Sequence, residues 1–332
     1  MLDRRGFLRA AAGAAAALPL ACRGEAPRWR PEAVRKPTRS PVAILPAPDY
    51  SQPALVDAVR RGLALCGVDP RGLGIVLKPN LVEHDPSGVI NTHPALVAAA
   101  IEAFRSEGAR DVVVAEGPGH RRDNEHLLRA SGLADQLRDM GARYVDLNHD
   151  AVRRTRLRSS FTRLGELWLP ATVLDADLFV SMPKLKTHHW AGATLSMKNL
   201  FGIVPGAVYG WPKNPLHWAG LEGSIVDVNA ALEGRRFNIV DGVVGMEGNG
   251  PIQGEARPVG ALVFGEDPVA VDASAARLMS LDPARLPYLA ASSLFLGNLE
   301  EERIEVRGED PDRFRADFRV VEDFEHAKVS SS

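Results

Sequence analysis

The chain has 332 residues, of which 45% are hydrophobic and 25% charged, and its net charge is −2 at pH 7 with a pI near 6.5. These values are typical of an ordinary globular protein and give no electrostatic support for a nucleic-acid partner. Its two cysteines are Cys22 and Cys66. A four-cysteine iron–sulfur cluster is therefore not expected. After the N-terminal segment, no run of residues is apolar enough to predict a transmembrane span.

Residues 1–26 have the pattern of a Tat export signal. Arg4 and Arg5 precede a Gly-Phe-Leu sequence and an Ala-rich apolar run that is too short for a comfortable membrane span. A chance basic region on an ordinary secretory signal is the alternative. We predict recognition by the Tat export machinery and a periplasmic or other extracytoplasmic location. Removing this segment takes away four basic and two acidic residues, which changes the net charge from −2 to −4.

The end of the predicted signal allows more than one form of the exported protein. Cys22 follows Pro-Leu-Ala, which resembles a lipoprotein cleavage box with Pro in the place that usually holds Leu. A lipid anchor at Cys22 and cleavage by an ordinary signal peptidase near Ala21 or Ala26 both stay open. The Tat route carries folded proteins, and many of them hold a metal or cofactor. The signal is compatible with such a group without naming it.

Strand-like and helix-like patterns alternate after a Pro- and Arg-rich segment, residues 27–41, which we interpret as a solvated linker. Strands are predicted over residues 43–47, 74–80, 111–117, 142–148, 177–183, 237–243 and 259–265, and helices over 53–65, 94–105, 124–140 and 268–279. This alternation predicts an α/β fold with a mostly parallel or mixed sheet, helices on both faces and Rossmann-like layering. We expect a single domain over residues 42–320 and a tail over 321–332, with a division into two lobes left open.

Polar side chains recur where the predicted strands end. Lys78, Glu116, Lys184 and Asp241 each stand at or just after such an end, and Glu266 follows another. In open α/β sheets, ligands bind outside the carboxyl ends of the strands. Strand ends that simply meet solvent also take polar residues. The recurrence of such residues at several strand ends favours a shared crevice.

The segment 181–202 carries the strongest indication of a site. Lys184, Lys186 and His188 alternate, so an extended backbone places them on the same side. Buried cations gathered in this way need an anion, either a ligand or partner carboxylates. These three residues and Lys198 are our candidate catalytic residues, with lysine and histidine as acid–base groups and anion clamps.

Other residues are predicted to bind the ligand around this segment. They are Lys78, Asn80, Glu116, Asn199, His217, Gly248, Asn249 and Gly250. Glycines allow close backbone approach to a ligand. For Lys78, binding of a substrate oxyanion and a structural pair with Asp272 both stay open. His189 is expected to point to the opposite face from His188.

A divalent metal is a second possibility for the acidic residues. His188, Asp241, Glu247 and Asp272 are candidate ligands, although their spacing matches no standard metal motif. Asp272 stands one turn into an otherwise apolar helix, so a carboxylate buried there is expected to have a cationic or metal partner.

Several long motifs carry a resemblance to a known family. They are KPNL (78–81), KLKTHHWAGATLSMKNLFGIVPG (184–206), NPLHWAGLEGSIVDV (214–228), DGVVGMEGNGPIQG (241–254) and EDPVAVDASAARLM (266–279). Over about residues 73–295 the chain resembles domain-of-unknown-function family 362. The resemblance implies an α/β fold and brings no settled activity. Some members carry an added cysteine-rich, ferredoxin-like segment and are labelled iron–sulfur centre proteins, a label that this chain does not take because it lacks the cysteines.

The sequence therefore supports an exported enzyme that binds a small anionic substrate, a carboxylate or a phosphate, in a crevice lined by Lys, His and Asp. The alternative is a non-catalytic binding or accessory protein that delivers an anion, metal or cofactor to a partner. A redox-associated component is a third hypothesis, which rests only on the family label.

Overall fold

The computed structural model describes residues 27–119, 123–211 and 213–329. The predicted signal segment, residues 1–26, and the predicted lipid anchor at Cys22 lie outside the described residues.

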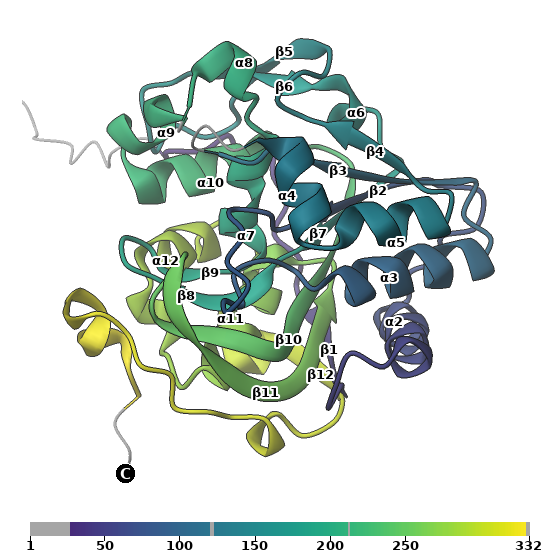
Figure 1. Cartoon of the computed structure of the whole chain (residues 1–332). Helices are drawn as coiled ribbons and strands as arrows, with labels where there is room; N and C mark the ends of the chain where they lie inside the picture. Colours follow the sequence, from purple (N-terminus) through teal and green to yellow (C-terminus); the bar gives the residue numbers. More distant parts are fainter. Residues whose placement is uncertain (1–26, 120–122, 212, 330–332) are drawn as a thin grey trace, which may run out of the picture.

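A mixed sheet of ten strands forms the centre of the molecule, in the order β12-β1-β11-β10-β7-β2-β3-β4 with β8 and β9 attached beside β10 (Figure 1). Its strands are β1 (Ser40–Pro46), β2 (Gly74–Pro79), β3 (Asp111–Glu116), β4 (Arg143–Asp146), β7 (Leu178–Met182), β8 (Lys184–His188), β9 (Gly192–Thr194), β10 (Arg235–Asn249), β11 (Gln253–Gly265) and β12 (Ile304–Gly308). Along that path β11 is antiparallel to both of its neighbours and all other pairs are parallel. The predicted mostly parallel or mixed sheet is confirmed.

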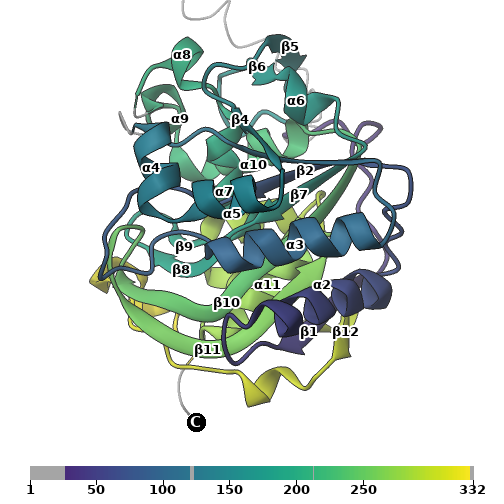
Figure 2. The same cartoon turned by 45° about the vertical axis from the view of Figure 1, so that its right-hand side comes forward.

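Helices cover both faces of this sheet (Figures 1 and 2). One face is packed by α2 (Gln52–Cys66), α3 (Pro94–Ser106) and α5 (Leu133–Asp139), and the other by α10 (Leu221–Ala231), α11 (Pro268–Leu278) and α12 (Pro287–Ser293). Successive strand residues enter opposite cores, as Ile75 and Leu77 pack on one face and Val76 on the other. Burial on both faces explains why these strands are apolar runs rather than alternating patterns, and it confirms the predicted α/β layering.

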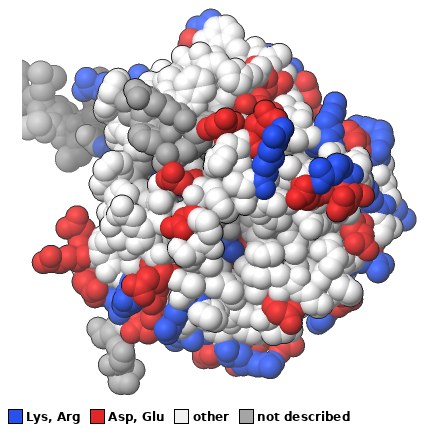
Figure 3. All heavy atoms as spheres, viewed as in Figure 1, with Lys and Arg blue, Asp and Glu red and all other residues white. Residues whose placement is uncertain are grey.

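Shorter elements complete the fold. They are β5 (Val152–Arg156) and β6 (Glu166–Pro170), which pair as a separate antiparallel sheet, the helices α4 (Asn124–Ala130), α6 (Ala171–Leu174), α7 (Ser196–Asn199), α8 (Gly206–Tyr209) and α9 (Asn214–Trp218), and the 3₁₀ turns η1 (Leu200–Ile203), η2 (Pro283–Arg285), η3 (Glu301–Arg303), η4 (Pro311–Arg313) and η5 (Glu322–Ala327). None of the helices in the part of the chain that the structure describes has the length and apolar character needed to span a bilayer. Acidic and basic side chains are interspersed on the face seen in Figure 3.

The segment that we predicted to be a solvated linker and part of the segment that we expected as a tail are both packed against the domain. In the expected linker, the Trp29 ring stacks on Phe295 with centroids 4.9 Å apart, and Ser40 already begins β1. In the expected tail, η5 buries Phe324 beside Gly192. Single aromatic anchors inside charged stretches hold both segments, and overall composition does not reveal such anchors.

The structure adds a strand that was not predicted directly after the predicted strand 177–183. β7 ends at Met182, and β8 follows at once as a further strand that pairs with β10 and β9. All five residues of β8 are buried. The cationic side chains of this segment therefore lie within the sheet rather than in a loop, which places them beside the carboxyl ends of β2 and β3.

Candidate functional site

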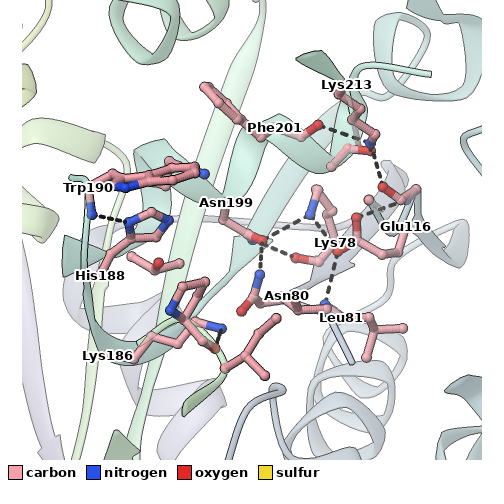
Figure 4. A pocket seen from close by; sticks show the side chains of 18 of the residues that line it. Lys78, Asn80, Leu81, Glu116, Lys186, His188, Trp190, Asn199, Phe201 and Lys213 are labelled. Atoms are coloured by element: carbon pink, nitrogen blue, oxygen red, sulfur yellow. Dashed lines mark hydrogen bonds and ion pairs between the residues drawn. The ribbon is translucent and has the colours of Figure 1, made fainter. Parts of the chain in front are cut away.

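A cavity of about 390 Å³ opens at the carboxyl ends of β2 and β3, beside β8 and α7. We call it the lysine cavity. The predicted residues that line it are Lys78, Asn80, Glu116, Lys186, His188, Lys198, Asn199 and His217. Most of them are labelled in Figure 4, which shows them pointing toward a common space from separate strands and loops. The remaining lining comes from residues that sequence reasoning did not assign: Leu81, Val82, Gly117, Gly119, His189, Trp190, Thr194, Phe201, Gly202, Lys213, Pro251 and Ile252.

A buried ion pair forms the floor of the lysine cavity (Figure 4). Lys78 Nζ donates to Glu116 Oε2 at 2.6 Å and to Asn199 Oδ1 at 2.9 Å. Burial lowers the Lys78 pKa, and the Glu116 carboxylate opposes that shift. A Cβ on Gly202 would lie 2.0 Å from Glu116 Oε1, so the close approach of the chain here requires glycine. Lys78 thus pairs with Glu116, and the considered pair with Asp272 is wrong.

Two other buried lysines have only carbonyl partners among the described residues. Lys186 Nζ donates to the carbonyl oxygens of Ile90 at 2.8 Å and Pro251 at 3.3 Å. Lys213 Nζ donates to the carbonyl oxygens of Gly117 at 2.6 Å and Phe201 at 3.1 Å. Burial and the neighbouring ammonium groups lower the Lys186 pKa well below its ordinary value, and burial lowers that of Lys213 to about 7. Both sites disfavour the charged amine until an anion arrives.

Lys198 is the least constrained of the four cavity lysines. It stands in the last turn of α7, and most of the residue is covered although it is not fully buried. Its Nζ lies 4.0 Å from the Phe201 ring centroid, and no hydrogen bond or ion pair joins it to any residue within the described ranges. Burial, with the Lys78 charge adding to it, lowers the Lys198 pKa to about 7. An aromatic face holds a cation more weakly than a carboxylate does, so this amine is available to a ligand.

The two adjacent histidines offer a fixed donor and a fixed acceptor. His188 Nδ1 accepts the backbone N–H groups of Trp190 at 3.0 Å and Ala191 at 3.2 Å, so its ring proton resides on Nε2. His189 Nδ1 lies 2.7 Å from the Gly250 carbonyl oxygen and donates to it, which leaves His189 Nε2 as an acceptor. Burial and nearby cations lower the His188 pKa well below its ordinary value and keep that ring neutral. The prediction that His189 faces away from the site is wrong, because the strand ends at His188 and the chain turns there.

Three polar atoms at the cavity wall are buried without a hydrogen-bond partner in the part of the chain that the structure describes. They are Asn80 Oδ1, Thr194 Oγ1 and His217 Nδ1. Asn80 and Thr194 are 7% and 4% exposed. Buried polar atoms in native proteins normally have a partner, so these three atoms are open to hydrogen bonds with water or with a polar ligand.

Lys184 and Asp241 do not join the lysine cavity, in contrast to our prediction. Lys184 Nζ donates to Asp241 Oδ2 at 2.7 Å, to the Tyr50 hydroxyl at 2.9 Å and to the Val244 carbonyl at 3.2 Å. The Tyr50 hydroxyl in turn donates to Asp241 Oδ1 at 2.9 Å. We call Lys184, Asp241 and Tyr50 the paired cluster. Its separation from Lys186 follows from the register shift in β10, which pairs Lys184 with Asp241 but Lys186 with Met246.

Asp272 has no cationic side chain as its partner among the residues that the structure describes, so the expected pair with a lysine is corrected. Its Oδ1 accepts the backbone N–H of Ser196 at 2.7 Å and its Oδ2 that of Met197 at 2.9 Å. These are the first amides of α7, so the carboxylate fixes the start of the helix that carries Lys198. Burial raises the Asp272 pKa to about 7 despite these hydrogen bonds.

The proposed metal ligands are not brought together either. Glu247 accepts from the Arg319 side chain at 2.9 Å, Asp241 belongs to the paired cluster and Asp272 caps α7. Only His188 of the predicted set lines the lysine cavity. Across residues 27–119, 123–211 and 213–329, no three His, Cys, Asp or Glu side chains form a group with metal-binding geometry.

The predicted glycine-rich ligand loop lies behind the wall of the lysine cavity rather than in it. Gly250 accepts from His189 through its carbonyl, and a Cβ on Gly250 would lie 2.0 Å from the Thr187 carbonyl oxygen. Gly248 accepts from the Thr187 hydroxyl at 2.8 Å. Asn249 is exposed and lines a shallower outer pocket. These three residues are not among those that line the lysine cavity, and their role in ligand binding stays a prediction.

Lys213 is the main residue that sequence reasoning missed. It stands in a Pro-rich stretch between α8 and α9 and has a left-handed backbone with φ of 65°, yet only 3% of it is exposed. Nothing in a WPKNP sequence distinguishes it from a solvated lysine. The signal that does exist is the density of Gly and aromatic residues around it, which is typical of a loop folded onto a site.

These features define an α/β protein with a cavity at its strand ends that is lined by lysines and histidines. The model for the Domain of unknown function (DUF362) matches residues 75–277, and the chain belongs to that family, which confirms the resemblance. A thylakoid-associated protein of Synechocystis sp. is 29% identical over 264 residues, which are 75% of this chain and 78% of that protein.

Two solved structures are also similar. A Thermotoga maritima protein has 15% sequence identity and a TM-score of 0.43, with 80% of this chain and 62% of that chain covered. The lactate racemase apoprotein from Thermoanaerobacterium thermosaccharolyticum has 15% identity and a TM-score of 0.41, with 76% of this chain and 58% of that chain covered. This chain therefore spans less than two thirds of the length of either protein.

Proposed function

We propose that the lysine cavity binds a small organic anion, a carboxylate or a phosphate, and that the protein is an enzyme acting on it. The observation that carries this proposal is the excess of cationic side chains over carboxylates. Lys186, Lys198 and Lys213 line the cavity with no acidic partner among the described residues, while the one lining carboxylate, Glu116, already pairs with Lys78. Burying an ammonium group without a counter-charge is unfavourable, and a bound anion removes that penalty.

The walls of the cavity support a ligand with an apolar body. Leu81, Phe201 and Ile252 supply apolar surface, and Trp190, which is 61% exposed, stands at the rim. A volume of about 390 Å³ accommodates a compact ring or short chain together with its charged group. The unpartnered atoms of Asn80 and Thr194 would contact polar groups on the same ligand.

The histidines support proton transfer rather than binding alone. His188 presents an Nε2–H donor and His189 an Nε2 acceptor, and their ring centroids are 4.9 Å apart. Lys198 and Lys213, whose pKa values are lowered to about 7, exchange protons readily near neutral pH. A protein that only delivers its ligand needs no such groups, and it would show binding without turnover.

Anion binding is expected to be accompanied by a measurable uptake of protons from solvent. Because a bound carboxylate favours the charged form of each lysine, binding at pH 8 must draw protons from solvent. Calorimetric titration of the full chain with 3-phenylpropionate and with phenyl phosphate, each in two buffers of different ionisation enthalpy, measures affinity and proton uptake together. The uncharged 3-phenylpropionamide is the matched control ligand.

Lys186→Met and Lys213→Met are each expected to weaken binding by about tenfold or more, the equivalent of about 1.4 kcal/mol. Lys36→Met is the control, because Lys36 is partly buried elsewhere and pairs with Glu300. Unchanged affinity in both cavity variants, or equal binding of acid and amide, would refute the proposal.

We also propose that the protein works outside the cytoplasm, on the strength of the Arg4–Arg5 pattern in the sequence. Fractionation of cells that express the full chain tests this, with Arg4→Lys/Arg5→Lys as the variant. Retention of the variant and export of the parent chain are expected, whereas equal export would exclude the Tat route.

A further inference from the structure

The lysines of the cavity differ in how their amines are held. Lys78 is engaged by a carboxylate, and Lys186 and Lys213 donate to backbone carbonyls. Lys198 alone among these four has no hydrogen-bond partner in the described ranges, and its ammonium lies over the Phe201 ring. An amine that is free of hydrogen bonds keeps its lone pair available once it loses its proton.

The surroundings of Lys198 favour that loss. The ammonium lies close enough to Lys186, His188 and His217 to lower the pKa of each, so these groups converge on one space. Burial and the Lys78 charge lower the Lys198 pKa to about 7, which leaves much of the amine neutral under physiological conditions. Desolvation beside a second cation is an established way of making a lysine nucleophilic.

We infer that Lys198 is a covalent nucleophile that forms an imine with a short oxo acid, whose carboxylate is held by Lys186 and the Nε2–H of His188. This inference deepens the proposed function and rests on it. The oxo acid that fits the arrangement is a 2-oxo acid, because its carbonyl carbon is directly bonded to its carboxylate carbon. A carboxylate beside Lys186 therefore sets the electrophilic carbon near the neighbouring Lys198 amine.

The step balances without any oxidant or reductant. The neutral Lys198 nitrogen attacks the carbonyl carbon, a C–N bond forms and the π electrons move to oxygen. One N–H proton passes through the acceptor nitrogen of His189 to that oxygen, which gives a carbinolamine. The second amine proton then leaves with the hydroxyl as water, and the nitrogen lone pair forms the C=N bond. The product is a neutral imine, and a proton taken up from solvent converts it to an iminium, which is an electron sink for bond cleavage at the adjacent carbon.

Reductive trapping tests this inference. The full chain is incubated at pH 7.5 with phenylpyruvate and cyanoborohydride, and the modified lysine is located by peptide mass spectrometry. We expect a single adduct on Lys198 that forms at least about tenfold faster than adducts on exposed lysines, since desolvation selects the neutral amine. Lys198→Arg should remove this adduct, because a guanidinium does not deprotonate.

A matched ligand distinguishes failure of imine formation from failure of the proposed anion binding. 3-Phenylpropionate has the same body and carboxylate but lacks the carbonyl, so it should bind without labelling and should protect wild-type Lys198 from phenylpyruvate. That protection requires no variant and holds even if Lys198→Arg folds poorly. If 3-phenylpropionate binds and phenylpyruvate leaves Lys198 unmodified, the imine is refuted and anion binding stands. If neither acid binds, the proposed function fails as well, and an adduct on Lys186 or Lys213 instead would overturn the assignment of the nucleophile.

Discussion

Lys184 and Lys186 are two residues apart on β8, and both are almost fully buried, at 2% and 0% exposure. Lys184 has Asp241 at 2.7 Å and a hydroxyl at 2.9 Å, and its three donors are satisfied. Lys186 has two carbonyl oxygens and no carboxylate among the described residues. Burial of a lysine therefore does not by itself indicate a site. The informative feature is a buried ammonium whose counter-charge the protein does not supply.

The largest expected effect is a difference in the free energy of unfolding between variants of the two lysines. Lys184→Met leaves the Asp241 carboxylate buried without its cation, and we expect the free energy of unfolding to fall by roughly 3–5 kcal/mol. Lys186→Met removes a cation with no counter-charge, so without ligand the change should stay within about 1 kcal/mol of wild type. Urea unfolding of both variants measures the contrast, and equal losses would mean that the paired cluster and the lysine cavity are not physically distinct.

A smaller effect is expected at the hydroxyl of the paired cluster. The Tyr50 hydroxyl joins Asp241 to Lys184, and burial beside Asp241 raises its pKa above the ordinary tyrosine value. Tyr50→Phe should lower the free energy of unfolding by about 1.5–3 kcal/mol, the range for hydrogen bonds to charged groups. Its affinity for 3-phenylpropionate should not change, because Tyr50 lies outside the lysine cavity.

Tyr209→Phe is the control for this variant, since the one hydrogen bond of the Tyr209 hydroxyl within the described residues comes from the neutral backbone N–H of Trp168, at 2.7 Å. We expect a loss of about 0.5–1.5 kcal/mol for it. Indistinguishable losses at the two tyrosines would argue that the paired cluster is no stronger than an ordinary neutral hydrogen bond.

Introducing a carboxylate should convert the lysine cavity into a second paired cluster. Asn80→Asp is close to isosteric and places a negative charge among the cavity lysines. We expect the affinity for 3-phenylpropionate to fall by about tenfold or more, about 1.4 kcal/mol, because the new carboxylate takes the place of the anion. Asn249→Asp adds the same charge at an exposed position outside the cavity and should change affinity by less than about twofold. Calorimetric titration compares the two, and a similar loss in both would point to a general charge effect.

Much of the fold follows from the sequence because strands buried on both faces are continuous apolar runs. The runs in β2, β3 and β7 could be recognised in this way, as could the helical pattern of α2 and α3. β8 could not, because its sequence KLKTH has no apolar pattern although every residue in it is buried. It is stabilised as a strand by pairing with β10 and β9, a tertiary effect that no local propensity contains.

The sequence predicted correctly those site residues that stand at the ends of predicted strands. Lys78 and Glu116 meet because β2 and β3 are adjacent parallel strands. Lys184 could not be separated from Lys186 by sequence, because the separation comes from a register shift in a partner strand far along the chain. Asp272 was misassigned for a related reason, since the helix start that it caps is a tertiary contact.

The last expected effect concerns the pH dependence of stability. The Lys213 pKa is lowered to about 7 in the folded protein, whereas an unfolded lysine keeps a value near 10.4. Between these values the unfolded chain binds more protons, so the free energy of unfolding should rise with pH from about 7 to about 10. Below pH 7 the amine is charged in both states and the penalty for burying it is fully present.

Lys213→Met removes this titrating amine. It should reduce the slope of the free energy of unfolding against pH by at most about 1.4 kcal/mol per pH unit. Urea unfolding at pH 7 and pH 9.5 measures the slope, with Lys184→Met as the comparison, because Lys184 is paired with Asp241 and lies outside the lysine cavity. Saturating 3-phenylpropionate should flatten the wild-type slope in the same way, since a bound anion restores the proton to the cavity. If neither the substitution nor the ligand changes the slope, the cavity lysines do not titrate near neutrality and the basis for an uncompensated cationic cavity is lost.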